Sequence, residues 1–302
     1  MLWVKAVRAP FFTAAIIPVA LGSVIAWHDT SKFNWFHFSL VMLGAIFMHA
    51  ATNLMNDYFD HLSGCDEANP NPTPFSGGSR VIQDGLITPR KILIAALIAL
   101  SLGSLIGLYL NYICGGNVIL ILGIIGVLLA IFYTPKQFKI VYGGFGEIAV
   151  GIGFGPLMVM GSYYVQAQQL PFKIFLASLP IGILIALILF INEFPDYAVD
   201  KTVGKNTLVV ILGKEKAIRL YHFLLLFTYL LILSFVLYNI LPRIALIVFL
   251  SLPLALRAFK ISQKNFERVY ELLAANASTI ALHSVIGLLL CAGFILDKIL
   301  FQ

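Results

Sequence analysis

The residues best suited to chemistry in this sequence gather in a stretch that follows a long apolar segment. In a chain that otherwise avoids charge, this stretch carries carboxylates, amides and a guanidinium: Asn53, Asn56, Asp57, Asp60, Asp66, Glu67 and Arg80. Residues three and four positions apart are neighbours on a helix. A helix here would therefore place Asn53, Asn56 and Asp60 on one stripe of oxygen-bearing side chains.

A second acidic stretch lies far downstream and reads NEFPDYAVD from Asn192 to Asp200. By the same helical rule, Asn192, Asp196 and Asp200 form a second stripe. Several close carboxylates repel one another unless a cation lies between them. Hard oxygen ligands suit magnesium, which binds through a few carboxylates together with substrate phosphates. The two stripes therefore predict a magnesium ion that carries a pyrophosphate.

The segment 58–90, which follows the first stripe, is far longer than a typical connection, and such length usually marks function or disorder. Its run of alternating asparagines and prolines from Asn69 to Pro74 breaks any helix. Gly77 and Gly78 come next, and their backbone amides can approach an anion. This loop is a weak phosphate signal by itself. Its position beside several acids strengthens the signal, because a metal-bound diphosphate needs both signs of charge around it.

The elements that must position these residues are membrane-spanning helices. The chain has 302 residues, of which 60% are hydrophobic and 11% charged, and its mean hydropathy is +0.94. A soluble domain of this size would not hide so much apolar surface. We predict an all-α polytopic membrane protein that forms a single transmembrane domain over 1–302, with acidic segments near 53–90 and 192–216. Apolar runs of about 20 residues predict about nine spans, near 9–27, 36–56, 91–112, 116–133, 144–165, 173–194, 219–239, 242–259 and 276–299.

The distribution of basic residues predicts how the chain is oriented. Cytoplasmic loops carry the excess of Lys and Arg. If the N-terminus is inside, only four of the twenty basic residues fall in outer segments: Lys32, Lys173, Arg243 and Lys298. Four spans separate the acidic stretches, so both face the cytoplasm of a cell-membrane protein, and the odd number of spans places the C-terminus outside. The first apolar segment is expected to be a retained helix and not a cleaved leader, because many more spans follow.

The net charge of +6 is explained by the excess of Lys and Arg in the inner loops and by their attraction to anionic lipid head groups. It does not indicate nucleic-acid binding, because no basic patch interleaved with aromatic residues exists outside the loops. The three cysteines have no CxxC spacing, so neither a disulfide framework nor a zinc site is indicated.

Three further features each have a structural and a functional interpretation. His49 lies one turn before Asn53 on the same stripe, and it either packs in the interior or lines a cavity. Glu147 opens a glycine-rich span and is a functional candidate if it lies within the membrane. The loop 133–143 is either an ordinary positive-inside loop with interfacial aromatics or part of the site, and its relevant residues are Tyr133, Lys136, Lys139 and Tyr142.

The two acidic stretches resemble those of the UbiA superfamily of intramembrane aromatic prenyltransferases. The closest branch is the 1,4-dihydroxy-2-naphthoate polyprenyltransferases of menaquinone biosynthesis. The resemblance covers about residues 5 to 295, and the pairing of two motifs is highly specific. The motifs that carry it are Asn56-Asp57-Tyr58-Phe59-Asp60 through Asp66, and Asn192 with Asp196 and Asp200. Four further segments support the resemblance: Gly155-Pro156, Tyr163-Tyr164-Val165-Gln166, Ser178-Leu179-Pro180-Ile181-Gly182 and Gly204-Lys205-Asn206-Thr207-Leu208.

The resemblance implies nine helices around a central cavity, where two Asp-rich motifs bind Mg²⁺ and an isoprenyl diphosphate. Asp66 matches the displaced third acid of the naphthoate branch, because position 64, where the hydroxybenzoate branch has Asp, is Gly here. Arg80 would hold the diphosphate, and Asn192 would support the second metal. The implied metal ligands are Asn56, Asp60, Asp66, Asp196 and Asp200. The expected substrate-binding residues are Asn53, Asp57, Arg80, Lys139, Asn192 and Lys201.

Two departures from the family pattern bear on the aromatic acceptor more than on the metal chemistry. The usual Asn-Asn-x-Arg-Asp before the second motif is replaced by Asn192-Glu193-Phe194-Pro195-Asp196. The glycines that usually follow Tyr133-Thr134 are replaced by Pro135 and Lys136.

The implied reaction is the ionisation of an allylic diphosphate, followed by attack of an electron-rich ring and release of diphosphate. Magnesium, held by acids such as Asp60 and Asp196, would neutralise charge on the leaving group. The ring of Tyr133 or Tyr142 would shield the allylic cation. The expected acceptor is a dihydroxynaphthoate in quinone biosynthesis, and the alternatives are hydroxybenzoate or a lipid glyceryl phosphate.

Two other classes of membrane protein compete with a prenyltransferase. A CDP-alcohol phosphotransferase should show a DGxxAR...GxxxDxxxD block, which this sequence lacks. A cation or proton transporter would place acids near the bilayer midplane within broken helices, whereas these acids lie at one rim.

Overall fold

A computed structural model describes residues 1–138 and 140–301, and within these ranges it contains only helices and the turns and loops between them. The predicted all-α fold is confirmed. The elements in chain order are α1 (Leu2–Ala6), η1 (Ala9–Phe12), α2 (Thr13–Thr30), α3 (Trp35–Ser63), α4 (Pro89–Cys114), α5 (Val118–Phe132), η2 (Val141–Gly143), α6 (Gly146–Ile152), η3 (Gly153–Leu157), α7 (Met158–Ala167), α8 (Phe172–Asn192), α9 (Tyr197–Val203), α10 (Leu208–Leu212), α11 (Lys214–Leu237), η4 (Arg243–Ser251), α12 (Leu252–Asn265) and α13 (Val269–Phe301).

Eight helical segments of the described chain are long and apolar enough to cross a membrane. Some combine consecutive elements: η1 with α2, α6 with η3 and α7, and η4 with α12. The remaining predicted span, 116–133, is the apolar helix α5, which has 15 residues. At 1.5 Å per residue it is about 22 Å long, which is less than the hydrocarbon core of about 30 Å. The chain is thus a multi-pass membrane protein with eight candidate spans and one shorter apolar helix.

The span Gly146–Ala167 is interrupted by the π-helix η3, which contains Pro156. Proline lacks an N–H group and interrupts the α-helical hydrogen-bond ladder, so the wider turn is accommodated there. A Cβ added at Gly155 would overlap the backbone of Gly182 in α8. The two helices therefore touch backbone to backbone, as small residues permit in membranes. This contact fixes η3 beside the cavities described below, which Phe154 lines.

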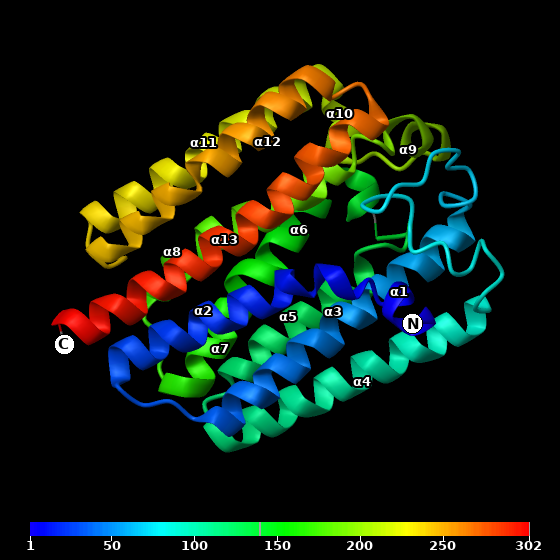
Figure 1. Ribbon diagram of the computed structural model, residues 1–302. Helices are drawn as coiled ribbons and strands as arrows, with labels where there is room; N and C mark the ends of the chain where they lie inside the picture. Colours follow the sequence, from blue (N-terminus) through cyan, green and yellow to red (C-terminus); the bar gives the residue numbers. More distant parts are fainter. Residues whose placement is uncertain (139, 302) are drawn as a thin grey trace.

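Helix α8 lies at the centre of the bundle and is the most deeply buried of the candidate spans. Its side chains pack with those of α2, α11 and α13 in the main hydrophobic core. Figure 1 shows α11 and α12 along one edge of the bundle and α4 along the other, with α13 and α2 between them. The N- and C-termini lie at opposite ends of the bundle (Figure 1).

The two ends of the bundle are organised differently. At one end, the loop between α3 and α4 lies against α9 (Figure 1). At the other end, Asp29 accepts hydrogen bonds from Tyr163 Oη at 2.9 Å and from Lys173 Nζ at 3.1 Å. Lys298 Nζ donates to the carbonyl of His28 at 3.0 Å. These contacts connect α2, α7, α8 and α13 at the end that was predicted to face outward.

Candidate functional site

The first predicted stripe is carried intact by α3, which continues as a helix past the predicted end of its span. Asn53, Asn56 and Asp60 all line one cavity. Asn56 Nδ2 donates to Asp60 Oδ2 at 3.0 Å and to Thr134 Oγ1 at 3.3 Å. Asn53 Nδ2 donates to the carbonyl of Val7 at 2.9 Å. The predicted helical stripe is confirmed, and its amides are held in place by the surrounding chain.

The second acidic stretch is not a single helix, so the prediction of a second helical stripe is wrong. Helix α8 ends at Asn192, and α9 begins only after a turn. Pro195 has no N–H group to extend the hydrogen-bond ladder of α8, which favours the end of the helix at this point. The N–H of Asp196 instead donates to the carbonyl of Glu193 at 3.2 Å. Asn192, Asp196 and Asp200 nevertheless line the same cavity as the first stripe.

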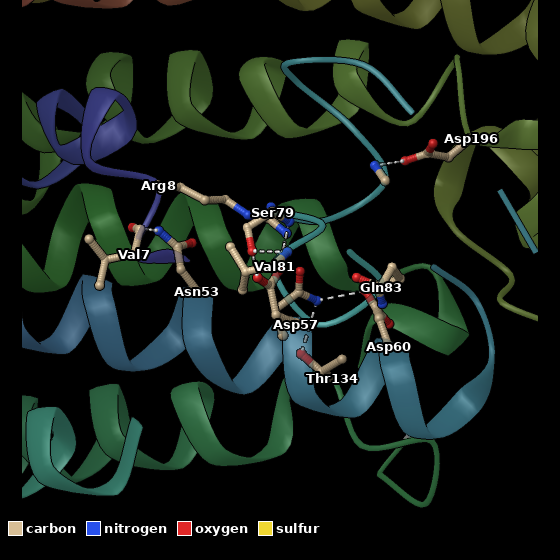
Figure 2. Close-up of polar contacts among 12 residues, drawn as sticks. Val7, Arg8, Asn53, Asp57, Asp60, Ser79, Val81, Gln83, Thr134 and Asp196 are labelled. Carbon is tan, nitrogen blue, oxygen red and sulfur yellow. Dashed lines mark hydrogen bonds and ion pairs between the residues drawn. The ribbon is translucent and has the colours of Figure 1, made fainter. Parts of the chain in front are cut away.

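Direct contacts join the two acidic stretches at one end of the bundle. Lys205 Nζ lies 3.1 Å from Asp60 Oδ2, and Cys65 Sγ donates to Asp200 Oδ1 at 3.5 Å. Asp60 and Asp196 line one cavity, which has a volume of about 190 Å³. Figure 2 shows Asp196 in contact with the loop that follows α3. Two segments far apart in the sequence therefore converge on one polar cavity.

Most of the predicted site residues line this polar cavity, and several unpredicted residues line it with them. The predicted ones are Asn53, Asn56, Asp60, Asp66, Tyr133, Asn192, Asp196 and Asp200. The unpredicted ones include Arg8, Asn69, Phe154, Glu193, Lys205 and Thr207. Gly77 and Gly78, which were predicted to approach an anion, also line the cavity. His49 also lines the cavity, and its ring packs against the rings of Phe12 and Phe154 at centroid distances of 5.3 and 4.6 Å. Both interpretations of His49 therefore hold.

Asp57 and Arg80 were predicted to bind substrate, but neither is among the residues that line the cavity. Asp57 is buried, pairs with Arg8 at 2.5 Å, and accepts hydrogen bonds from the backbone N–H and the hydroxyl of Ser79 (Figure 2). Arg80 Nη1 donates to the carbonyl of Asp66 at 2.5 Å. Asp57 therefore fixes the loop against α3, and Arg80 joins two parts of the loop itself. Their positions do not support direct contact with substrate.

Three other predicted residues also fall outside the cavity lining or outside the described chain. Tyr142 is buried next to Lys136, whose ammonium lies 5.8 Å from its ring centroid, and it does not line the cavity. Lys201 is exposed on α9. Lys139 lies outside the described residues. Tyr133 is the predicted tyrosine that reaches the cavity.

The cations that do reach the cavity are Arg8 and Lys205. Arg8 precedes η1 with a φ of 52° and enters the site because the N-terminal segment packs on α3. The sequence predicted Arg8 only as one of the basic residues on the inner side of the membrane. It gave Lys205 no role beyond its place in the segment Gly204–Leu208. Burial opposes the charge of Lys205, but the nearby Asp60 and Asp200 outweigh burial and raise its pKa well above the ordinary value. The cavity therefore contains two firmly charged cations that can pair with phosphate oxygens.

The pKa values of three acids in the cavity are raised by burial and by neighbouring carboxylates. Burial, reinforced by the neighbouring Asp60, raises the pKa of Asp66 to about 7. Burial also raises the pKa of Asp200 to about 7, with a contribution from Asp196. The pKa of Asp196 is raised as well, chiefly by burial. These carboxylates need further positive charge before they can all be ionised together.

The donor set fits a magnesium ion that is shared with a substrate. The described residues contain no group of three or more His, Cys, Asp or Glu side chains close enough to hold an ion by themselves. Mg²⁺ typically binds through one or two carboxylates and completes its shell with water and substrate phosphates. Asp66 Oδ2 is buried and has no hydrogen-bond partner, so it is available to a cation. The oxygen-rich set that fits such an ion is Asn56, Asp60, Asp66, Asp196 and Asp200.

We expect the binding of a divalent cation to become tighter as pH rises towards 7. The pKa of Asp66 and of Asp200 rises from about 4 in the unfolded chain to about 7 in the fold. The fold therefore binds more protons than the unfolded chain, so the stability of the cation-free protein falls as pH rises through this window. A cation displaces these protons, and each displaced proton makes affinity about tenfold tighter per pH unit below 7. Mn²⁺ titrations from pH 5 to 8 would measure this, and a flat profile would contradict it.

The glycine loop packs between the acids of both stretches. Gly77 and Gly78 have positive φ angles of 75° and 76°. The N–H of Gly77 donates to Asp196 Oδ2 at 3.2 Å, so an acid accepts from the amide that was predicted to approach an anion. A Cβ added at Gly78 would overlap the carboxylate of Asp66. Glycine at this position therefore allows Asp66 to reach the cavity.

Gly78→Ala is expected to displace Asp66 and to weaken Mn²⁺ binding about tenfold, as changes behind metal ligands commonly do. Gly85→Ala is the matched control, because Gly85 also has a positive φ, of 67°, but a Cβ there meets no atom within 4 Å. Equal losses in the two variants would show that backbone strain, and not the displacement of Asp66, is responsible.

A second, apolar cavity of about 380 Å³ adjoins the polar one. It is lined by apolar side chains and glycines of α3, α4, α5, α7 and η3, among them the exposed Leu108, Ile124 and Leu128. Because these three side chains reach the apolar surface of the protein, the cavity borders the lipid at α4 and α5. The residues that line both cavities are Thr52, Tyr133, Val150 and Phe154.

Glu147 and Glu193 form a buried pair of carboxyl groups beside the polar cavity, 5% and 6% exposed respectively. The two carboxyl groups lie within hydrogen-bond reach of one another, and the backbone at Leu208 also reaches the carboxyl group of Glu147. Burial and the neighbouring Glu147 raise the pKa of Glu193 well above its usual range. Glu193 lines the cavity, whereas Glu147 is not among the lining residues.

Comparison with known proteins bears directly on this arrangement. The UbiA prenyltransferase family model matches residues 15–293. The chain belongs to the UbiA prenyltransferase family. This membership makes it an enzyme of the prenyltransferase class, and it does not support the phosphotransferase and transporter alternatives.

Relatives within the UbiA family place the chain near one branch. It is 28% identical to a 1,4-dihydroxy-2-naphthoate octaprenyltransferase of Bacillus subtilis, over 98% of this chain and 93% of that protein. It is 33% identical to a 1,4-dihydroxy-2-naphthoate octaprenyltransferase of Mycobacterium tuberculosis, over 85% of this chain and 84% of that protein.

The fold of this UbiA enzyme is also that of solved family structures. A UbiA homolog from Archaeoglobus fulgidus, bound to GPP and Mg²⁺, superimposes with a TM-score of 0.73 at 16% identity, over 98% of each chain. At this identity, the likeness shows a shared fold.

Proposed function

We propose that the enzyme transfers a polyprenyl group from an allylic isoprenyl diphosphate to an aromatic acceptor, with Mg²⁺ as cofactor and release of diphosphate. The proposed acceptor is a dihydroxynaphthoate in quinone biosynthesis, which the identity to naphthoate octaprenyltransferases supports. The observation that carries the proposal is the meeting of a charged cavity and an apolar cavity at Tyr133. An isoprenyl diphosphate has these two halves, joined at the bond that breaks.

The charged cavity would hold the diphosphate. Arg8 and Lys205 would pair with its oxygens, since hydrogen bonds from charged donors to phosphate oxygens are the strong ones. The five oxygen-bearing residues named above would hold Mg²⁺ against the same anion, and the ion would neutralise charge on the leaving group. The alternating signs of charge around the cavity suit this combined ligand.

The apolar cavity would hold the isoprenoid tail. Its lining is nearly free of polar groups, and its border at α4 and α5 would allow a long chain to continue into the lipid. Burial of a tail is favourable in proportion to the apolar area removed from water. The tail would thus fix the position of the first allylic carbon near Tyr133.

Bond cleavage would occur at the boundary between the two cavities. The allylic carbon–oxygen bond breaks, diphosphate remains with the cations, and the rings of Tyr133 and Phe154 face the allylic cation. The apolar walls exclude water, which would otherwise quench that cation. A ring carbon of the acceptor then forms the new carbon–carbon bond, and the proton on that carbon leaves to restore the aromatic ring.

We further propose that the whole chain acts as one transmembrane domain. Its N-terminus and acid-lined cavity would face the cytoplasm, where soluble diphosphate is released, and its C-terminus would lie outside. Charge distribution supports this orientation, because most Lys and Arg residues lie at the end of the bundle that holds the polar cavity.

Purified protein in lipid nanodiscs would test the activity. A long-chain polyprenyl diphosphate is offered with a panel of acceptors: a dihydroxynaphthoate, hydroxybenzoate and a glyceryl phosphate. We expect prenylated dihydroxynaphthoate and equimolar diphosphate by mass spectrometry, both abolished by EDTA and restored by Mg²⁺. Preferred prenylation of another acceptor would overturn the proposed substrate, and turnover of none would overturn the proposed reaction.

A further inference from the structure

Lys205 holds an acid of the first stretch although it belongs to the second. Its ammonium lies 3.2 and 3.1 Å from the two carboxylate oxygens of Asp60. The side chains of Lys205 and Asp60 are only 11% and 6% exposed. Buried charges are tolerated only when they are paired, so each group depends on the other.

The backbone of Lys205 is fixed, whereas its side chain is long and flexible. Gly204 ends α9 with a φ of 73° and reverses the chain. The N–H of Lys205 then donates to the carbonyl of Asp200 at 2.8 Å, and the N–H of Thr207 donates to the carbonyl of Lys205 at 3.0 Å. A lysine ammonium on a four-carbon stem can change direction by rotamer changes alone. The cavity therefore contains a cation that can move without any change in the fold.

Arg8 differs from Lys205 in this respect. Its guanidinium is bound to Asp57, a buried carboxylate outside the cavity lining that also accepts from Ser79. That carboxylate is no candidate for the metal, so a metal in the cavity does not compete for the partner of Arg8. Lys205, in contrast, is paired with a residue of the predicted metal-binding set.

The contact with Lys205 uses both carboxylate oxygens of Asp60. Asn56 Nδ2 also donates to one of them, at 3.0 Å. A divalent cation on the same oxygens would be repelled by an ammonium at hydrogen-bond distance. The ammonium and the metal therefore exclude one another at Asp60.

We propose, on the basis of the proposed function, that Lys205 is a tethered cation that competes with the metal for Asp60 and moves to the diphosphate when metal and substrate bind together. Lys205 is then a positioning residue for the carboxylates and a ligand of the leaving group. When metal binds alone, it must displace the Lys205 ammonium from Asp60, and the ammonium is left without a partner. When diphosphate binds together with the metal, its oxygens become the new partner of the ammonium. The enzyme would thus favour the joint binding of metal and isoprenyl diphosphate over the binding of metal alone.

The proposal predicts opposite effects of one substitution on two affinities. In Lys205→Met, Mn²⁺ binding measured without diphosphate should become about tenfold tighter, because a charged competitor for the ligand is removed. Binding of a farnesyl thiodiphosphate in the presence of Mn²⁺ should become about tenfold weaker, because a charge-assisted contact is lost. Lys216→Met is the matched control, because Lys216 is exposed on α11, and it should change neither affinity.

Two other results of this experiment would overturn the proposal. If Lys205→Met leaves Mn²⁺ affinity unchanged, Lys205 is only a diphosphate ligand. If the substitution weakens Mn²⁺ binding, the lysine only holds the acids in place. Lys205→Arg, which keeps the charge, should retain weak Mn²⁺ binding close to that of the unmodified protein.

A second measurement uses the unmodified protein and does not depend on whether Lys205→Met folds. Lysines are modified with limiting acetylating reagent, with and without Mn²⁺, and the extent at each site is read by mass spectrometry. Mn²⁺ without diphosphate should increase modification of Lys205 relative to Lys216, because the ammonium is released from Asp60. An unchanged ratio at Mn²⁺ concentrations that saturate binding would overturn the proposal.

Neither measurement requires an acceptor or turnover. Failure of the proposed function would appear as absence of prenylated product, while the response of Lys205 to Mn²⁺ would still be measurable. Failure of the Lys205 proposal would leave turnover with the aromatic acceptor intact. The two can therefore be distinguished.

Discussion

Asp60→Asn is expected to lower prenyl-transfer turnover on the order of a thousandfold, because it removes the charge that would hold the metal and neutralise the leaving group. Asp60 receives contacts from both acidic stretches, through Asn56 on its own helix and Lys205 beyond α9. Asparagine keeps the shape of the side chain but presents only one acceptor oxygen. Single-turnover assays with saturating Mg²⁺ would separate this loss from weaker substrate binding.

Asp84→Asn is the matched control for the same change of charge. Asp84 belongs to the same loop region, but it is partly exposed and pairs with Lys5 at 3.2 Å. Its substitution should leave turnover within about twofold, as most surface changes do. A comparable loss in both variants, or near-normal turnover in Asp60→Asn, would remove the acidic cavity from the mechanism.

The second large effect is expected from a substitution in the apolar cavity, Gly126→Phe. Gly126 lines this cavity, and a Cβ there meets no heavy atom within 4 Å, so a larger side chain has room to enter. The added ring would occupy space that we assign to the distal tail. We expect kcat/KM for a long-chain polyprenyl diphosphate to fall about a hundredfold, while use of dimethylallyl diphosphate is retained.

Ile121→Phe is the control for added bulk on the same helix. Ile121 is 57% exposed on α5 and does not line the cavity. It should leave the preference for chain length unchanged. If Gly126→Phe lowers activity with short and long diphosphates equally, the cavity does not hold the tail, and the ring disturbs the fold instead.

The parts of the site that the sequence predicted well are those set by local helix geometry. Asn53, Asn56 and Asp60 share a stripe because α3 is unbroken through them. Asp196 and Asp200 also reached the cavity, although Pro195 broke the helix that was expected to align them. Both residues still line the predicted site because the turn after α8 brings the chain back over the same end of the bundle.

The cations were predicted less well, because their positions depend on backbone reversals and on tertiary packing. Arg80 follows the glycine loop, but its own φ is 64°, and its side chain turns back to a loop carbonyl. Lys201 lies next to Asp200, yet neighbours on a helix point about 100° apart, so it faces outward. Lys205 follows the reversal at Gly204, and Arg8 arrives with the distant N-terminus. The spacing of residues along the sequence does not predict these backbone reversals or this tertiary packing.

The position of Tyr133 at the boundary of the two cavities has a consequence for the fate of the products. In the proposed reaction, the scissile bond lies at the boundary between the polar and the apolar cavity. Its cleavage therefore leaves the water-soluble fragment and the lipid-soluble fragment on different sides of that boundary. The ionic fragment is left facing the aqueous phase, and the newly alkylated ring is already anchored among hydrocarbon chains. Chemistry and partitioning would then be a single event, and no carrier would be needed to deliver the product to the bilayer.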